Sequence, residues 1–205
     1  MTDKNQVVEN RASFINRLNQ ASLTPDEIKS VMLAYRLAKS AHRTIDRDDG
    51  TRYFEHCRAG CLILMDELNL YDPELLASFL LHDSGEDTAL LGYIFESYHQ
   101  FLDDASYFLV RTFSMRVCKN VIRLTKPAID KDSFFDKEHV YEYYISHLIQ
   151  SEEAILLKMV DRLHNLRSLL GNKPEKIARQ IKETEDVYLP IFKSVSGKFT
   201  PYAKI

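Results

Sequence analysis

The stretch EEAILLKMVDRLHNLRSLL, residues 152–170, has the clearest helical pattern in this chain. Its apolar residues recur at three- and four-residue spacing, which is the spacing of neighbours on an α-helix. The same spacing continues through most of the 205 residues, and only 6 Gly and 6 Pro interrupt it. At 45% hydrophobic residues, the chain can also bury a sizeable core. We therefore predict an all-α protein that folds as one helical bundle.

Capping signals and polar breaks predict where the helices begin. Thr24-Pro25 and Asp72-Pro73 each combine an N-cap residue with a proline at the first helical position. No linker, repeat or change of composition divides the chain, so we expect a single domain over residues 1–205. The predicted helices cover about 5–20, 25–42, 55–69, a segment from 73 into 80–88, two or three segments within 88–124, and then 137–149, 152–170 and 174–189, the last ended by Pro190.

Charge and hydropathy exclude several kinds of partner. The net charge of -3 leaves no basic excess to hold a nucleic-acid backbone, so we expect no nucleic-acid partner. No stretch approaches the ~18 apolar residues that a membrane span requires. The polar N-terminus MTDKNQVVEN lacks the apolar segment of a signal peptide. We therefore expect a cytoplasmic protein with no membrane partner.

The cysteines do not make a disulfide framework. There are three, Cys57, Cys61 and Cys118, which is an odd number. Cys57 and Cys61 lie beside His56 at a spacing that could suggest zinc, but no second pair completes a four-ligand site. We expect these thiols to be small core residues.

The stretch LLHDSGEDT, residues 80–88, places one imidazole and three carboxylates within six positions, directly after an apolar run. Carboxylates this close together repel one another unless a cation or a proton lies among them. If the preceding helix continues through this stretch, His82, Asp83 and Glu86 point to one side. Histidine and carboxylate ligands together suit Mn, Fe or Zn better than Mg or Ca. Two adjacent ligands cannot hold such an ion alone, so further ligands must come from elsewhere.

Two candidates for those further ligands lie far away in the sequence. His56 stands near the start of a predicted helix, and Asp161 lies within the apolar stretch 152–170. A carboxylate in so apolar a helix destabilises the fold unless it is paired. Lys158 or Arg162 could form an ordinary ion pair with Asp161, so these residues alone leave both interpretations open.

The chain resembles the HD-domain metal-dependent phosphohydrolases in four blocks. HRTIDRDDGTRYFEH (42–56) is similar to the pattern H…R..G.pY..H, and LLHDSGEDT is similar to LLHD..EDT. LLKMVDRLHNLRSL is similar to K.aDRlHNmrtL, and ETEDVYLPI (183–191) is similar to ET..iyaPl. Together these blocks resemble the hydrolase domain of RelA/SpoT-type enzymes over about 30–191, followed by a tail at about 192–205. The resemblance implies an HD-domain helical bundle that acts as a stand-alone small alarmone hydrolase.

By this resemblance, the chain hydrolyses the 3′-pyrophosphate of ppGpp or pppGpp to GDP or GTP plus pyrophosphate. The implied cofactor is Mn²⁺. The implied metal ligands are His56, His82, Asp83 and Asp161, and the implied catalytic pair is Glu86 and Asp87. The implied substrate-binding residues are Arg47, Asn165, Ser168, Lys158, Arg162 and Tyr188.

Two departures from the family pattern keep alternatives open. The family's R-K-S-G loop reads Arg47-Asp48-Asp49-Gly50 here, which makes the cleft less positive. This loop favours considering another substrate for the same chemistry, either an adenosine alarmone such as pppApp or the 2′-phosphate of NADPH. A further alternative is a catalytically idle module that binds a nucleotide. Ser84-Gly85 replaces two larger residues and could loosen the helix there. The aromatic stretch 89–113 could form a lid, a dimer surface or core, so a homo-oligomer also remains open.

Overall fold

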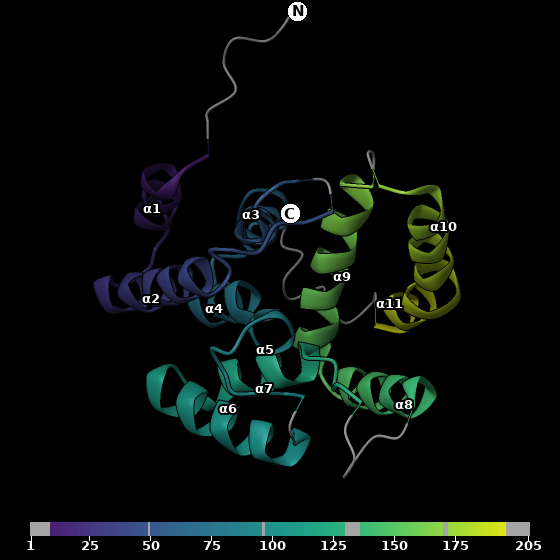
Figure 1. Ribbon diagram of the computed structural model, residues 1–205. Helices are drawn as coiled ribbons and strands as arrows, with labels where there is room; N and C mark the ends of the chain where they lie inside the picture. Colours follow the sequence, from purple (N-terminus) through teal and green to yellow (C-terminus); the bar gives the residue numbers. More distant parts are fainter. Residues whose placement is uncertain (1–8, 49, 96, 130–135, 170–171, 196–205) are drawn as a thin grey trace, which may run out of the picture.

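The computed structural model describes residues 9–48, 50–95, 97–129, 136–169 and 172–195. Within these ranges the chain forms helices and no strand, apart from an isolated bridge between Asp46 and Arg52. The all-α prediction is therefore confirmed (Figure 1). The elements are α1 (Arg11–Gln20), α2 (Pro25–Ala41), α3 (Tyr53–Leu62), the π-helical η1 (Ile63–Glu67), α4 (Pro73–Leu81), α5 (Ser84–Asp87), α6 (Tyr98–Thr112), α7 (Met115–Leu124), α8 (Lys137–Leu148), α9 (Glu152–Arg167), α10 (Pro174–Glu183), the π-helical η2 (Thr184–Tyr188) and α11 (Leu189–Val195).

The expected capping residues begin the helices that carry the core. The Thr24 hydroxyl oxygen accepts a hydrogen bond from the Glu27 N–H, and the Thr24 N–H donates to the Glu27 carboxylate in return, so α2 starts with a capping box. Asp72 caps α4 by accepting from two backbone N–H groups. These local hydrogen bonds satisfy donors that a helix start leaves free, which explains why both starts follow from the sequence.

One cluster of buried apolar side chains extends from α1 to α11. The helix α4 contacts α2, α3, α7 and α9, and α9 stands between α3 on one side and α10 and α11 on the other (Figure 1). Gly60 lets α3 approach α4, because a Cβ there would lie 1.8 Å from Phe79 Cε1. This close packing brings His56, one turn before Gly60, next to the end of α4.

Two expectations about helix ends are wrong. The helix that begins at Pro73 does not continue through 80–88, because α4 ends at Leu81 and a new turn, α5, begins at Ser84. Pro190 does not end the helical course, because the π turn η2 runs directly into α11 and Pro190 is the second residue of that helix. Both η1 and η2 are π turns that re-aim the chain within longer helical segments, and residue spacing alone does not reveal them.

The cysteines are all buried, whereas the aromatic side chains differ in exposure. All three thiols are buried and free, as expected of core cysteines. Within 89–113, Tyr98 and Phe101 belong to the core, whereas Tyr93, Phe95 and Tyr107 are exposed. Asp49 and most of the tail expected at about 192–205 lie outside the described residues, and the described part of that tail, 192–195, belongs to α11. Among the helices that are described, none is long and apolar enough to cross a membrane.

Candidate metal centre

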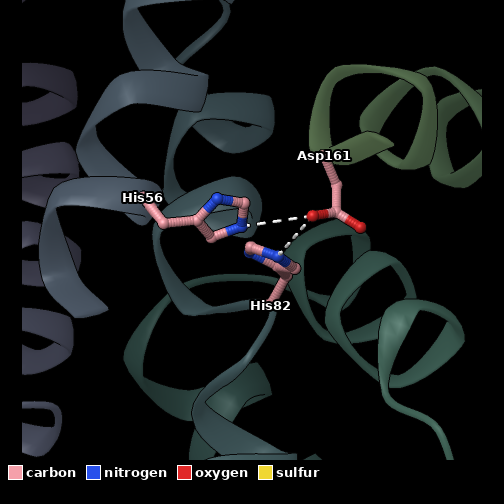
Figure 2. Close-up of side chains that lie close together, drawn as sticks. All are labelled: His56, His82 and Asp161. Carbon is pink, nitrogen blue, oxygen red and sulfur yellow. Dashed lines mark ion pairs between the residues drawn. The ribbon is translucent and has the colours of Figure 1, made fainter. Parts of the chain in front are cut away.

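Four side chains from three separate segments converge at the centre of the fold. His56 comes from α3, His82 and Asp83 from the turn between α4 and α5, and Asp161 from the middle of α9. Figure 2 shows both imidazoles pointing towards the Asp161 carboxylate. His56, His82 and Asp161 are all buried, so these polar groups lie in a site with little access to water. Residues that the sequence pattern could only propose as distant partners therefore come together.

The ligating atoms of His56, His82 and Asp161 all lie within 4.8 Å of one another, as the ligands of one ion do, and Asp83 lies beside both imidazoles but outside that group. Two atoms that bind an ion at about 2.1 Å and at right angles lie about 3 Å apart. His82 Nε2 is 3.0 Å from Asp83 Oδ2, and His56 Nε2 is 3.2 Å from Asp161 Oδ1. His56 Nε2 is also 3.5 Å from Asp83 Oδ2, and His82 Nε2 is 4.0 Å from Asp161 Oδ1. His82 Nε2 is buried and faces carboxylate oxygens of Asp83 and Asp161 at 3.0 and 4.0 Å. The residues present fit a divalent transition metal.

Hydrogen bonds to neighbouring groups hold three of these side chains in place. His82 Nδ1 donates to the Phe79 carbonyl over 2.7 Å, which directs Nε2 at the centre. The Tyr53 hydroxyl donates to Asp83 Oδ2 over 3.0 Å. Asp161 accepts from Asn165 Nδ2 over 2.7 Å, and its other oxygen lies 2.8 Å from Lys158 Nζ. The ion pair that the sequence suggested for Asp161 thus exists, and it leaves Oδ1 directed at the imidazoles.

Electrostatics shows that the cluster is suited to positive charge. Burial would raise the pKa of Asp161, but Lys158 and His56 outweigh that effect, and its pKa lies well below the usual range. Burial would lower the pKa of His82, but the Asp83 and Asp161 carboxylates raise it to about 9. The carboxylates therefore stay ionised and keep a proton on His82 at neutral pH. A bound cation would displace that proton, since a ligating imidazole must be deprotonated.

His56 has a neighbour of a different kind. Its Nδ1 lies 2.8 Å from Nδ1 of His164 on α9, with the two ring centroids 4.7 Å apart. Burial, together with the nearby His56 and Arg47, lowers the pKa of His164 to about 4, so His164 is neutral. Both rings line a hollow of about 330 Å³ that Arg47 and Ser168 also border. His164 therefore stands directly behind His56.

The expected catalytic acids lie on α5, next to the four ligands. Burial raises the pKa of Glu86 to about 7, and the Asp83 carboxylate adds to that effect. The Lys126 backbone N–H donates to Glu86 Oε1 over 2.6 Å and fixes the carboxyl group. Asp87 is exposed. A carboxyl group with a pKa near neutrality can accept or give a proton under ordinary conditions.

Ser84-Gly85, the departure from the family pattern, has a packing explanation at Gly85. A Cβ on this residue would lie 2.8 Å from Phe101 Cζ and 3.1 Å from the Thr125 side chain. The glycine therefore lets α5 press against α6 and the end of α7, which positions Glu86 under the Lys126 N–H.

Three of the predicted substrate-binding residues form a group on the His164 side. Arg47 Nη2 donates to Asn165 Oδ1 over 2.8 Å and to Ser168 Oγ over 3.4 Å. Because Asn165 also donates to Asp161, a continuous chain of hydrogen bonds runs from Arg47 to the metal centre. Arg47 is therefore held beside the centre although it lies in a loop far from α9 in sequence.

The other three form a second group that is more deeply buried. Arg162 lies 2.5 Å from Glu183 and stacks 4.5 Å from the Tyr188 ring centroid. Lys158 lies 5.7 Å from the same ring centroid while it pairs with Asp161. Tyr188 is only 3% exposed, so its ring serves mainly to hold the two cations. As substrate contacts, these residues stay predictions.

Two further features surround the centre. Asp48, one of the acids that replace the family's basic loop, lies 2.6 Å from Lys176 on α10, so its charge is partly neutralised. A second hollow, of about 610 Å³, adjoins Glu86 through Lys126. Its lining includes Lys137 and Arg179, and also Glu183, whose carboxylate pairs with Arg162.

Sequence reasoning assigned no specific role to three contributors. Tyr53, which holds Asp83, stands one helical turn before His56, and that spacing could have identified it. His164 lies within the DRLHN block, and its ring contacts the ring of His56 rather than an ion. Lys126 donates to Glu86 through its backbone N–H, and the residue type does not reveal a contact of this kind.

The chain is also similar to known proteins. A family model described as HD domain matches residues 34–194. The bifunctional (p)ppGpp synthase/hydrolase SpoT of Escherichia coli (strain K12) is 33% identical over 181 residues, which cover 86% of this chain and 23% of that protein. A GTP pyrophosphokinase of Streptomyces antibioticus is 31% identical over 179 residues, covering 86% of this chain and 19% of that protein. The chain thus spans about a quarter or less of the length of these relatives.

A solved structure shares the fold. It is described as a metazoan ortholog of SpoT that hydrolyzes ppGpp and plays a role in starvation responses. It matches with a TM-score of 0.55 and 23% identity, over 85% of this chain and 98% of that chain. At this level of identity, the match supports the arrangement of helices in Figure 1.

Proposed function

The chain belongs to the HD domain family, and from that premise we propose that its metal centre hydrolyses the 3′-pyrophosphate of guanosine alarmones. The products would be GDP or GTP together with pyrophosphate. The observation that carries this proposal is the convergence of His56, His82, Asp83 and Asp161 beside a carboxyl group whose pKa is near neutrality. A relative named guanosine-3′,5′-bis(diphosphate) 3′-pyrophosphohydrolase, from Vibrio cholerae, is 30% identical over 84% of this chain, which supports the same reaction.

We propose that the four side chains hold Mn²⁺. Two imidazole nitrogens and two carboxylate oxygens are a mixed donor set, which suits Mn²⁺ better than Mg²⁺ or Ca²⁺. When bound, the ion supplies Lewis acidity and lowers the pKa of water. The Phe79 carbonyl and the Tyr53 hydroxyl keep His82 and Asp83 aimed at it.

Glu86 is proposed to take the proton of the attacking water. The water oxygen forms a bond to the phosphorus attached to the 3′-oxygen, and the bond between that phosphorus and the 3′-oxygen breaks. One water proton passes to Glu86, whose pKa of about 7 lets it accept a proton and release it again. The departing 3′-oxygen receives a proton, with the exposed Asp87 beside the reacting groups as its candidate carrier.

The two hollows suggest how the nucleotide lies across the centre. Arg47, Asn165 and Ser168 offer a guanidinium, an amide and a hydroxyl on one side, which suits the base and ribose of a nucleotide. Lys126, Lys137 and Arg179 line the other hollow, where their positive charge would stabilise the departing pyrophosphate. We place this reaction in the cytoplasm, with a nucleotide as partner and neither a nucleic acid nor a membrane.

A nucleotide panel tests the proposal. The purified chain would be incubated with Mn²⁺ and ppGpp, pppGpp, pppApp or NADPH, and the products separated by ion-exchange chromatography. Release of pyrophosphate from ppGpp and pppGpp is the expected result. If only pppApp or NADPH reacted, the substrate assignment would be wrong, but the metal-dependent hydrolysis proposed for this centre would be supported. If none reacted and the protein bound no metal, the idle nucleotide-binding module would replace the enzyme.

A further inference from the structure

The contact between His56 and His164 carries an inference about how the metal centre is prepared. The two Nδ1 atoms lie 2.8 Å apart, and a hydrogen bond between two imidazole nitrogens requires one to donate and the other to accept. Two arrangements satisfy this distance. Either His56 donates to His164, or His164 donates to His56.

The two arrangements differ at the ring nitrogens that face away from the contact. If a neutral His56 donates through Nδ1, its Nε2 carries a lone pair and can bind a metal. If His56 accepts through Nδ1, its Nε2 carries a hydrogen and points it at Asp161, 3.2 Å away. Only the first arrangement is competent for metal binding.

His82 does not face this choice. Its Nδ1 contacts the Phe79 carbonyl, which can only accept, so its orientation is fixed by the backbone. His56 Nδ1 instead contacts His164 Nδ1, which can either donate or accept a hydrogen bond. The selection of its tautomer therefore rests on the state of His164.

We propose that His164 is a positioning residue that accepts from His56 Nδ1–H and thereby keeps His56 Nε2 free for the metal. A neutral His164 that accepts through Nδ1 must carry its hydrogen on Nε2. His164 lines the hollow of about 330 Å³ together with Arg47 and Ser168, and a ligand oxygen that binds in this hollow and reaches Nε2 would accept this hydrogen. Such a ligand favours the tautomer that the metal requires, and metal and ligand would each strengthen the binding of the other. This inference rests on the proposed metal-dependent function.

Metal affinity tests the inference without measuring turnover. His164→Phe keeps a ring but removes the acceptor, whereas His164→Gln retains an amide oxygen that can accept from His56. His147→Phe is the matched control, because His147 lies on α8 and its Nδ1 contacts the Tyr143 carbonyl instead. Mn²⁺ affinity would be measured by isothermal titration calorimetry on the full chain, after circular dichroism has established that each variant is folded.

We expect His164→Phe to weaken Mn²⁺ binding about 10- to 100-fold, the usual effect of removing the partner of a ligating histidine. His164→Gln should recover most of the affinity, and His147→Phe should match the parent. Equal Mn²⁺ affinity for His164→Phe and the parent would overturn the inference.

The tautomer of His56 can also be read directly in the parent protein. Nitrogen-15 NMR of the metal-free chain, with the signals assigned through His56→Gln, would report which ring nitrogen carries the hydrogen. Hydrogen on Nδ1, with or without hydrogen on Nε2, supports the inference because either form donates to His164, and hydrogen on Nε2 alone contradicts it. If the parent bound no Mn²⁺ the proposed function would fail, whereas this spectrum would still decide the role of His164.

Discussion

Replacing Glu86 with glutamine should make the protein more stable at pH 8 and at the same time lower kcat. The carboxyl group is mostly buried, lies near the Asp83 carboxylate and accepts the Lys126 N–H over 2.6 Å. The amide of Glu86→Gln has nearly the same shape and can still accept that hydrogen bond, but it cannot ionise. The variant therefore removes the charge of Glu86 and keeps its main contact.

The size of the effect follows from the pKa. Burial raises the pKa of Glu86 from 4.5 to about 7, so the folded state holds the proton more tightly than the unfolded state does. Stability from this group is complete below pH 4.5 and is lost as the pH rises through 7. Each pKa unit corresponds to 1.36 kcal/mol, so ionisation of Glu86 costs the folded protein roughly 3 kcal/mol at pH 8. Glutamine avoids that cost, and the gain should fall below about 1 kcal/mol at pH 5.

The assay is urea denaturation of chelator-treated protein at pH 5 and pH 8, followed by circular dichroism. Glu138→Gln is the control, because Glu138 is an exposed glutamate in the first turn of α8. In parallel, Glu86→Gln should retain Mn²⁺ binding and lose about 10²- to 10⁴-fold in kcat, the usual range for a proton-transferring group. Adding Mn²⁺ should shrink the stability gain at pH 8, because a nearby cation favours the ionised carboxyl of the parent.

Two results would refute this reasoning. Equal free energies of unfolding for parent and Glu86→Gln at pH 8 would mean that the carboxyl group is not held in an environment that disfavours its charge. Loss of Mn²⁺ binding in Glu86→Gln would mean that Glu86 is a ligand rather than a base.

Three other variants test separate parts of the site. Asp161→Ala should abolish Mn²⁺ binding and hydrolysis together, and atomic absorption of the dialysed protein would show metal if Asp161 were dispensable. Arg47→Ala should mainly raise KM, because it removes the donor to Asn165 and Ser168 and leaves the ligands in place; steady-state kinetics with an unchanged KM would contradict this role. Gly85→Ala should destabilise the protein by about 1–3 kcal/mol, since its Cβ would lie 2.8 Å from Phe101 Cζ, and an unchanged melting temperature would show that the ring moves freely.

Features that depend on neighbouring residues were predictable from the sequence. The starts of α2 and α4 follow from Thr24-Pro25 and Asp72-Pro73, because capping is a contact within one turn. The helical period also predicted α9, and of the two partners considered for Asp161 the structure has Lys158, at i and i+3. These interactions need no knowledge of the rest of the fold.

Features that depend on packing were not predictable in the same way. The break between Leu81 and Ser84 arises where α5 presses against Phe101, and neither side chain indicates that contact in sequence. The π turn η2 lets the chain pass Pro190 without ending its helical course. The hydrogen bond from Lys126 to Glu86 uses a backbone N–H from a segment forty residues away. Which residues approach His56, and hence the position of His164, emerges only from the fold.

The most direct test of the central claim is the product balance of one reaction. ppGpp incubated with the Mn²⁺-loaded chain should yield GDP and pyrophosphate in equal amounts, measured by ion-exchange chromatography, and Asp161→Ala should yield neither. Unchanged ppGpp, or release of orthophosphate in place of pyrophosphate, would contradict the assignment of this metal centre as an alarmone 3′-pyrophosphohydrolase.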